Sequence, residues 1–85
     1  MRKVLVLNPA DNIAICLEDM PAGTVIDQDN LKLTITQDIP RGHKVCSKAV
    51  IKGEGIIKYG ERMGHATKDI SVGEHVHTHN VLGDR

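Results

Sequence analysis

The stretch DMPAGTVI, residues 19–26, decides the fold because the chain repeats its pattern three more times. The later copies are DIPRGHKV (residues 38–45), AVIKGEGI (residues 49–56) and DISVGEHV (residues 69–76), and we call the four copies corners 1 to 4. Each has an aliphatic residue or methionine in second place, glycine in fifth place and an aliphatic residue in eighth place. Glycine adopts the positive φ that tight turns require, so each copy predicts a turn that leads into a strand. Four unevenly spaced corners predict a small, compact β domain and not a solenoid.

The segments between the corners have the length and composition of short strands. In LKLTIT, residues 31–36, every second residue is aliphatic, which is typical of a strand with one buried face. RKVLVL (residues 2–7) and NIAICL (residues 12–17) predict a hairpin, and GIIKYG (residues 55–60) predicts a further strand. CSKAVI, residues 46–51, could form one turn of helix. The whole chain, residues 1–85, is interpreted as a single, mostly-β domain.

The composition of the 85-residue chain excludes several classes of protein. Tyr59 is its one aromatic residue, so the core must consist of Ile, Val, Leu, Ala and Met. Eleven basic and eleven acidic residues cancel, which argues against nucleic-acid or anionic-membrane binding. Cys16 and Cys46 have no metal-type spacing, and the short apolar run near the N-terminus does not resemble a signal peptide or membrane span. We therefore expect a cytoplasmic protein with reduced cysteines.

Three of the five histidines alternate within GEHVHTHN, residues 73–80. In an extended strand, His75, His77 and His79 would share one face, and Asn80 would lie on the other. The Cα atoms of neighbouring histidines would then be about 6.5–7 Å apart, and those of the outer pair roughly 13 Å apart. Two of them could contribute to a metal or acid–base site that another chain completes. The alternative is a polar strand face without chemistry.

Three further residues are candidates for a site. His65 and His43 each follow a glycine, where a loop can present a side chain for acid–base chemistry. The other corners have Thr or Glu at the position of His43, so we expect His43 to be a surface residue. Lys58, beside Tyr59, could hold a carboxylate, or could be an ordinary surface residue. The sequence contains no Ser-His-Asp arrangement and no phosphate-binding loop.

The order of these motifs is similar to that in the N-terminal domain of the altronate and galactarate dehydratase family. The resemblance is carried by ADNIAICLEDMPAGTVI (residues 10–26), DIPRGHKV (residues 38–45) and GEGIIKYGERMGHATKDISVGEHVHTHNV (residues 53–81). It implies an SAF-type β-clip fold. It also implies a part in a hydro-lyase that converts a sugar acid to a 2-keto-3-deoxy acid with a divalent metal, commonly Fe²⁺.

The same resemblance implies a partner, because the dehydratases continue into a much larger catalytic region. The chain is then either a separate small subunit or a domain that acts with a large catalytic subunit or domain. On this basis His65 and His77 are expected to be catalytic, and His77 and His79 to bind metal together with the partner. The residues expected to bind the substrate are His75, His79, Lys58 and Asn80. The alternatives are a small subunit of sulfolactate sulfo-lyase and a non-catalytic carbohydrate- or protein-binding module. An edge strand could also pair two copies of the chain.

Overall fold

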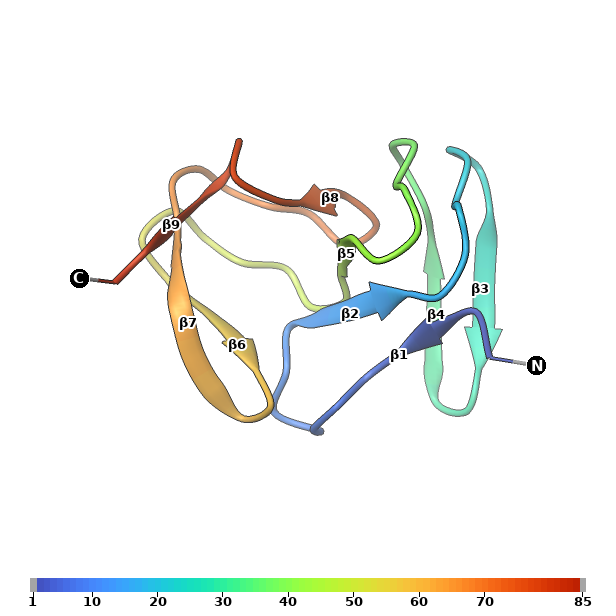
Figure 1. Ribbon diagram of the computed structural model, residues 1–85, viewed down its shortest axis with the longest axis horizontal. Coiled ribbons are helices and arrows are strands. Elements are labelled where there is room, and N and C mark those ends of the chain that lie inside the picture. The colour runs from blue at the N-terminus through green and yellow to red at the C-terminus, as the bar shows by residue number, and fades with distance from the viewer. Residues whose placement is uncertain (1, 85) are drawn as a thin grey trace.

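The computed structural model describes residues 2–84 and contains nine short strands and no helix in that range (Figure 1). The strands are β1 (Val4–Leu5), β2 (Ile13–Cys16), β3 (Val25–Gln28), β4 (Leu31–Thr34), β5 (Lys44–Cys46), β6 (Gly55–Lys58), β7 (Glu61–Ala66), β8 (His75–Val76) and β9 (Val81–Gly83). The predicted mostly-β class is therefore confirmed. Within residues 2–84 no helix has the length and apolarity needed to cross a membrane.

The turn of helix that residues 46–51 could have formed is not present. Backbone groups of this segment bond to distant parts of the chain and not to one another along a helix. Ser47 N donates to Asn12 O at 2.9 Å, and Val50 forms an antiparallel bridge with Ile70. These long-range hydrogen bonds already satisfy backbone groups of the extended segment, so the segment gains no hydrogen bonds by forming a helix.

The strands form three antiparallel sheets. The central sheet has the order β1-β2-β5-β8; β3 and β4 form a hairpin; and β6, β7 and β9 form the third sheet. In Figure 1 the β3–β4 hairpin lies at one end of the molecule and the β6-β7-β9 sheet at the other, with the central sheet between them. Both faces of the central sheet are therefore covered.

Two hydrophobic cores lie on the two sides of the central sheet, because successive side chains of a strand point to opposite faces. The first core consists of Val4, Ala14, Cys16, Met20, Ile26, Leu33, Ile35, Ile39 and Val45. The second core consists of Ile13, Cys46, Val50, Ile56, Ala66, Ile70 and Val76. On β5, for example, Val45 enters the first core and Cys46 enters the second.

All four corners have the predicted turn geometry. The φ angles of Gly23, Gly42, Gly53 and Gly73 are 94°, 85°, 91° and 93°. The aliphatic residues in second and eighth place of every corner are buried. Corners 1 and 2 supply their aliphatic residues to the first core, and corners 3 and 4 supply theirs to the second.

The corners join in pairs through their backbones. Met20 of corner 1 bridges Ile39 of corner 2, as Val50 of corner 3 bridges Ile70 of corner 4. In the first pair, the aspartate that begins each corner also accepts a hydrogen bond from the backbone of the other corner. Oδ1 of Asp19 accepts from Arg41 N and Oδ1 of Asp38 accepts from Ala22 N, each at 2.8 Å. In the second pair only Asp69 does so, accepting from Lys52 N at 2.8 Å, because corner 3 begins with alanine.

A buried carboxylate fixes the β6–β7 hairpin against the rest of the domain. Asp11 is 1% exposed, and its two oxygens accept hydrogen bonds from Tyr59 N at 3.1 Å and Gly60 N at 2.8 Å. Tyr59 and Gly60 both have positive φ, 57° and 73°, as a two-residue hairpin turn of type I′ requires. Asp11 thereby also positions Lys58, the last residue of β6.

Candidate functional site

The alternating histidines do not lie on one extended strand, and that prediction is wrong. β8 ends at Val76, and the chain turns before β9 begins at Val81. The side chain of Asn80 holds this turn. It is 0% exposed, its Oδ1 accepts from His77 N at 3.0 Å, and its Nδ2 donates to His75 O at 2.8 Å. An amide side chain thus takes the place of a neighbouring strand as hydrogen-bond partner.

The turn brings the histidine rings together. The Cα atoms of His75 and His79 would be roughly 13 Å apart on a straight strand, whereas in the turn the ring centroids of these residues are 5.2 Å apart. The rings of His75 and His77 are nearly parallel, with centroids 5.6 Å apart and an angle of 8° between their planes. The three histidines predicted to share a site are therefore close to one another, although for a different geometric reason.

His43 joins this group, and the expectation that it would be a plain surface residue is wrong. In the β5–β8 pairing, Val45 lies opposite His75 and Lys44 opposite Val76, so the same register places His43 opposite His77. Nδ1 of His43 is 2.8 Å from Nε2 of His75, and the ring centroids of His43 and His77 are 4.4 Å apart. We call His43, His75, His77 and His79 the histidine cluster. Corners 2 and 4 end in the strands β5 and β8. Antiparallel pairing of these two strands is the signal that would have identified His43.

The geometry of the histidine cluster fits a divalent metal ion. One ring nitrogen each of His43, His75 and His77 lies within 4.8 Å of the other two. Burial, followed by the neighbouring His43, His79 and His77, lowers the pKa of His75 below its ordinary value. Metals bind the neutral form of imidazole, which this environment favours. Three imidazoles would leave further coordination positions open, as in catalytic sites, and imidazole suits iron and zinc.

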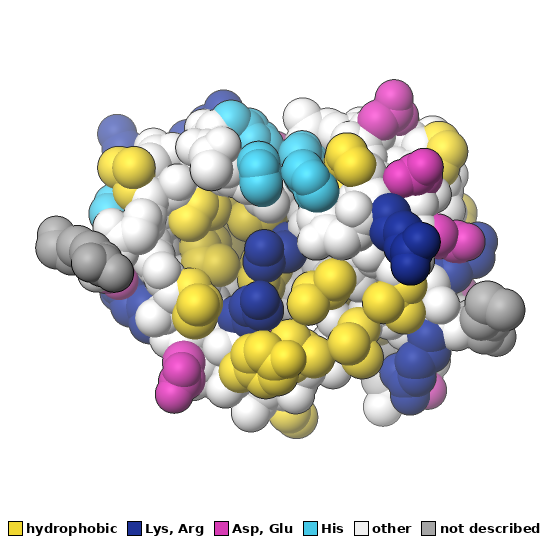
Figure 2. All heavy atoms as spheres, viewed as in Figure 1, with side chains coloured by type: hydrophobic (Ala, Val, Ile, Leu, Met, Phe, Trp, Pro, Cys, Tyr) yellow, Lys and Arg dark blue, Asp and Glu magenta, His cyan; other side chains and the backbone are white. Residues whose placement is uncertain are grey.

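A cavity of about 300 Å³ adjoins the histidine cluster and shares His77 with it. Its lining residues are Ile13, Lys44, Ile56, Lys58, Met63, Val76, His77, Thr78, Val81 and Gly83. Figure 2 shows histidine side chains together at the rim of a hollow, with basic and hydrophobic side chains inside it. Lys58, expected to bind substrate, thus lies at the cavity wall, whereas Lys44 was not singled out from the sequence.

Two of the predicted site residues are placed differently. His65 lies on β7, and its Nδ1 is 2.9 Å from Oδ1 of Asp84, whose other oxygen pairs with Arg62. The hydrogen bonds from Arg62 and then His65 lower the pKa of Asp84. Within residues 2–84, no ring contact joins His65 to the histidine cluster. Asn80, expected to contact substrate, has its side chain inside the turn, where both polar atoms bond to the backbone.

Comparison with known proteins identifies the family of the domain and shows relatives that are lyases. The family described as the altronate/galactarate dehydratase SAF domain matches residues 2–84. The chain belongs to this family. The SAF domain is 43% identical over 75 residues to altronate dehydratase of Escherichia coli (strain K12), covering 88% of this chain and 15% of that protein. It is 35% identical over 81 residues to altronate dehydratase of Bacillus subtilis (strain 168), covering 95% of this chain and 16% of that protein.

The SAF domain is also similar to a much smaller protein. It is 50% identical over 59 residues to the alpha subunit of (2R)-sulfolactate sulfo-lyase from Paracoccus pantotrophus, covering 69% of this chain and 88% of that subunit. The chain thus spans about one sixth of the length of the altronate dehydratases and most of the length of the sulfo-lyase subunit. It is homologous to the SAF region of the former and to the alpha subunit of the latter.

Proposed function

We propose that this SAF domain forms one wall of the active site of a sugar-acid dehydratase, with a larger catalytic subunit or domain forming the other wall. The observation that carries the proposal is the convergence of His43, His75 and His77 beside a cavity that contains two lysines. The names of the similar altronate dehydratases supply the reaction class, the loss of water from a sugar acid.

The residues of the histidine cluster suit the metal that the family is expected to use. We assign His43, His75 and His77 as ligands of a divalent ion, with Fe²⁺ as the expected metal. When bound, such an ion polarises substrate oxygens and stabilises the negative charge that develops next to a carboxylate. His75 is held in two ways, because β5 pairs with its backbone and His43 contacts its ring.

Dehydration of a sugar acid breaks the C–H bond next to the carboxylate and the C–O bond one carbon further along. The proton passes to a base, the hydroxyl leaves as water, and the resulting enol becomes a 2-keto-3-deoxy acid. His79 is an exposed member of the cluster and lies outside the three converging nitrogens, so its ring can face the substrate and transfer a proton. A catalytic role for His65 remains a prediction, and it requires the partner to bring the substrate to β7.

The test is dehydration of D-altronate by this chain mixed with its large partner in the presence of Fe²⁺. The variants are His43→Ala, His75→Ala, His77→Ala, His79→Ala and His65→Ala, with Lys32→Gln on β4 as a surface control. We expect each variant of the three proposed ligands to lose at least about a hundredfold in kcat/KM, the scale of one acid–base or ligand group. An active mixture in which these three variants match the wild type would refute the proposal.

A second candidate is the alpha subunit of a sulfolactate sulfo-lyase, which the coverage of 88% of that subunit favours. The same mixture is therefore assayed with (2R)-sulfolactate, with release of sulfite as the readout. Turnover of sulfolactate but not altronate would select this candidate. Failure of both substrates with an intact complex would favour the remaining alternative, a non-catalytic binding module.

A further inference from the structure

We infer that the cavity beside the histidine cluster is a subsite for the carboxylate of a small polyhydroxy acid, and that Lys44 and Lys58 bind this carboxylate. The identity of the acid rests on the proposed function, whereas the presence of an anion subsite rests on the cavity alone. Of the two lysines, Lys44 is the one that the sequence did not indicate.

The cavity is lined by positive charge, which favours the binding of an anion. Its lining includes two lysines and one histidine but no aspartate or glutamate. Both lysines are half-buried, and within residues 2–84 neither Lys44 nor Lys58 forms an ion pair or a side-chain hydrogen bond. The nearest compensation is the ring of Tyr59, whose centroid is 5.7 Å from Nζ of Lys58. Two ammonium groups at one cavity repel each other, and a carboxylate between them would remove that repulsion.

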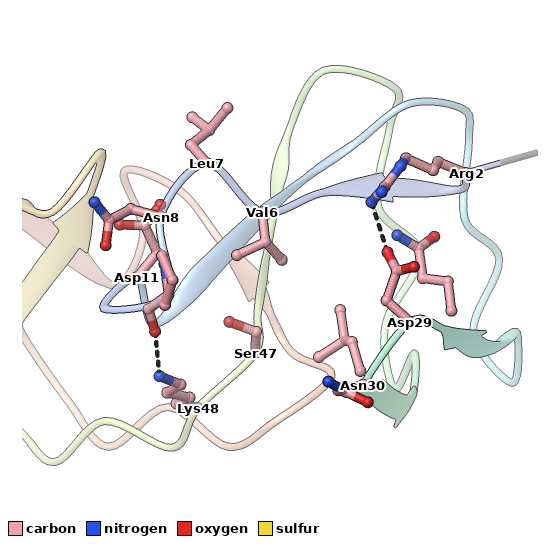
Figure 3. Close-up of a pocket in the computed structure, with 12 residues that line it drawn as sticks. Arg2, Val6, Leu7, Asn8, Asp11, Asp29, Asn30, Ser47 and Lys48 are labelled. Atoms are coloured by element: carbon pink, nitrogen blue, oxygen red, sulfur yellow. Dashed lines mark hydrogen bonds and ion pairs between the residues drawn. The ribbon is translucent and has the colours of Figure 1, made fainter.

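A second cavity lacks this property, although it is bigger. It has a volume of about 430 Å³ and lies on the side of β1 and the β3–β4 turn. Its basic groups already have partners: Arg2 lies 2.7 Å from Asp29, as Figure 3 shows, and Nζ of Lys48 donates to the backbone oxygen of Pro9 at 2.7 Å. The carboxylate of Asp11 accepts from the β6–β7 turn. Free positive charge, and not volume, therefore distinguishes the lysine-lined cavity.

The walls of the cavity strengthen the binding of a small anion. Ile13, Ile56, Val76 and Val81 contribute apolar surface, which lowers the local dielectric and makes the charge interactions stronger than in water. A volume of about 300 Å³ is at the lower end of the range for small-molecule sites, so it suits a small organic acid and not a nucleotide or a polymer.

The position of His77 connects this subsite to the histidine cluster. Lys44 follows His43 on the chain, and the alternation of the strand sends the lysine to the cavity side and the histidine to the cluster side. His77, in the turn after β8, belongs to both the cavity lining and the converging nitrogens. An acid with its carboxylate at the lysines therefore has its hydroxyl-bearing carbons directed toward His77, which is why a polyhydroxy acid fits.

The test is a titration of the ¹⁵N-labelled chain with D-altronate in buffer with EDTA, so that no metal contributes. Altritol, the uncharged polyol of the same carbon skeleton, is the matched control ligand. We expect altronate to shift the amide signals of residues 44, 58, 77 and 78 with a Kd of about 1 mM, the affinity of a few charge-assisted contacts. Lys44→Gln and Lys58→Gln should each weaken binding about tenfold, which corresponds to about 1.4 kcal/mol. Lys32→Gln removes the same charge from β4 and should leave the Kd unchanged.

Either of two results overturns the subsite. One is equal shifts with altronate and altritol, or none with either, which needs no variant to interpret. The other is wild-type affinity in both Lys44→Gln and Lys58→Gln. The outcome is separable from that of the activity assay. Altronate binding without turnover would support the subsite and refute the dehydratase proposal. Turnover with an unchanged KM in the double lysine variant would support the dehydratase proposal and refute the subsite.

Discussion

Replacing Asn80 by alanine tests how the turn of the histidine cluster is held. The side chain is fully buried and makes two hydrogen bonds, at 3.0 and 2.8 Å, to the backbone of His77 and His75. Each bond contributes about 1 kcal/mol, and each backbone group left without a partner costs a further 1 kcal/mol or so where water cannot reach it. Both bonds are partly exposed, so water recovers some of that cost. We expect Asn80→Ala to lower the free energy of unfolding by about 2–3 kcal/mol.

A loss of this size is large for a domain of 85 residues, whose total stability is on the order of 5–10 kcal/mol. It corresponds to a fall in Tm of roughly 10–20 °C. The assay is urea unfolding followed by far-UV circular dichroism in metal-free buffer. Asn30→Ala, at an exposed position, is the matched control and should change stability by less than about 0.5 kcal/mol.

A second readout separates a positioning role from plain destabilisation. At a temperature where the variant is fully folded, its affinity for Co²⁺ should fall at least about tenfold, because the backbones of two proposed ligands are no longer fixed. Asn80→Asp, which can still accept from His77 N but cannot donate to His75 O, should give intermediate values in both assays. If Asn80→Ala matches the wild type in stability, or loses stability but binds Co²⁺ as before, the reasoning about this turn is wrong.

Three further predictions concern other parts of the domain. Gly73→Ala should destabilise the protein by at least about 2 kcal/mol more than Gly23→Ala, since both residues have φ near 94° but only at Gly73 would the new Cβ lie 2.0 Å from a backbone oxygen. The lowered pKa of His75 means that the unfolded state binds more protons just below its ordinary value of 6.5, so this contribution to stability should be complete above pH 6.5 and lost as the pH falls. Burial raises the pKa of Cys16 and of Cys46 to about 11, so neither thiol should react with iodoacetamide at pH 8 until the protein unfolds.

Each of these has a result that would contradict it. Equal urea midpoints for the two glycine variants would mean that the β4 carbonyl moves away from corner 4 without cost. The pH effect is measured as the difference in urea midpoint between wild type and His75→Gln from pH 5 to 8, and a constant difference would exclude it. Rapid alkylation of the thiols in the folded protein would show that the central sheet opens far more often than its burial suggests.

The corners and their glycines were predictable from sequence because a tight turn leaves a local signal. Gly42 and Gly73 occupy the same place in their repeats, and both have the expected positive φ. The strand at residues 31–36 was equally visible from its alternation, although β4 itself ends at Thr34. Features that depend on a few neighbouring residues were thus within reach.

The site depends on pairings that no local pattern contains. The alternation of the histidines predicted a straight strand, but Asn80, three residues after His77, supplies the hydrogen bonds that bend it into a turn. His43 is 32 residues from His75 in sequence, and it reaches the cluster only because β5 and β8 pair in one particular register. Lys44 and Lys58 meet at one cavity because Asp11 fixes the hairpin that carries Lys58. Register and long-range capping decide the site, and neither leaves a periodic signature.

Strand β5 and the residue before it leave little freedom for divergence among relatives. Four consecutive side chains serve four parts of the molecule: His43 the histidine cluster, Lys44 the cavity, Val45 the first core and Cys46 the second core. A substitution at any of them alters packing or chemistry on its own face and shifts the backbone that carries the other three.

Variation is therefore easier among the exposed residues that line the cavity. Met63 and Thr78 line the same cavity from exposed positions, where a change of size or polarity disturbs neither core. A domain of this design can keep residues 43–46 constant while the exposed part of the cavity lining varies, so one scaffold can present different cavity surfaces in different relatives.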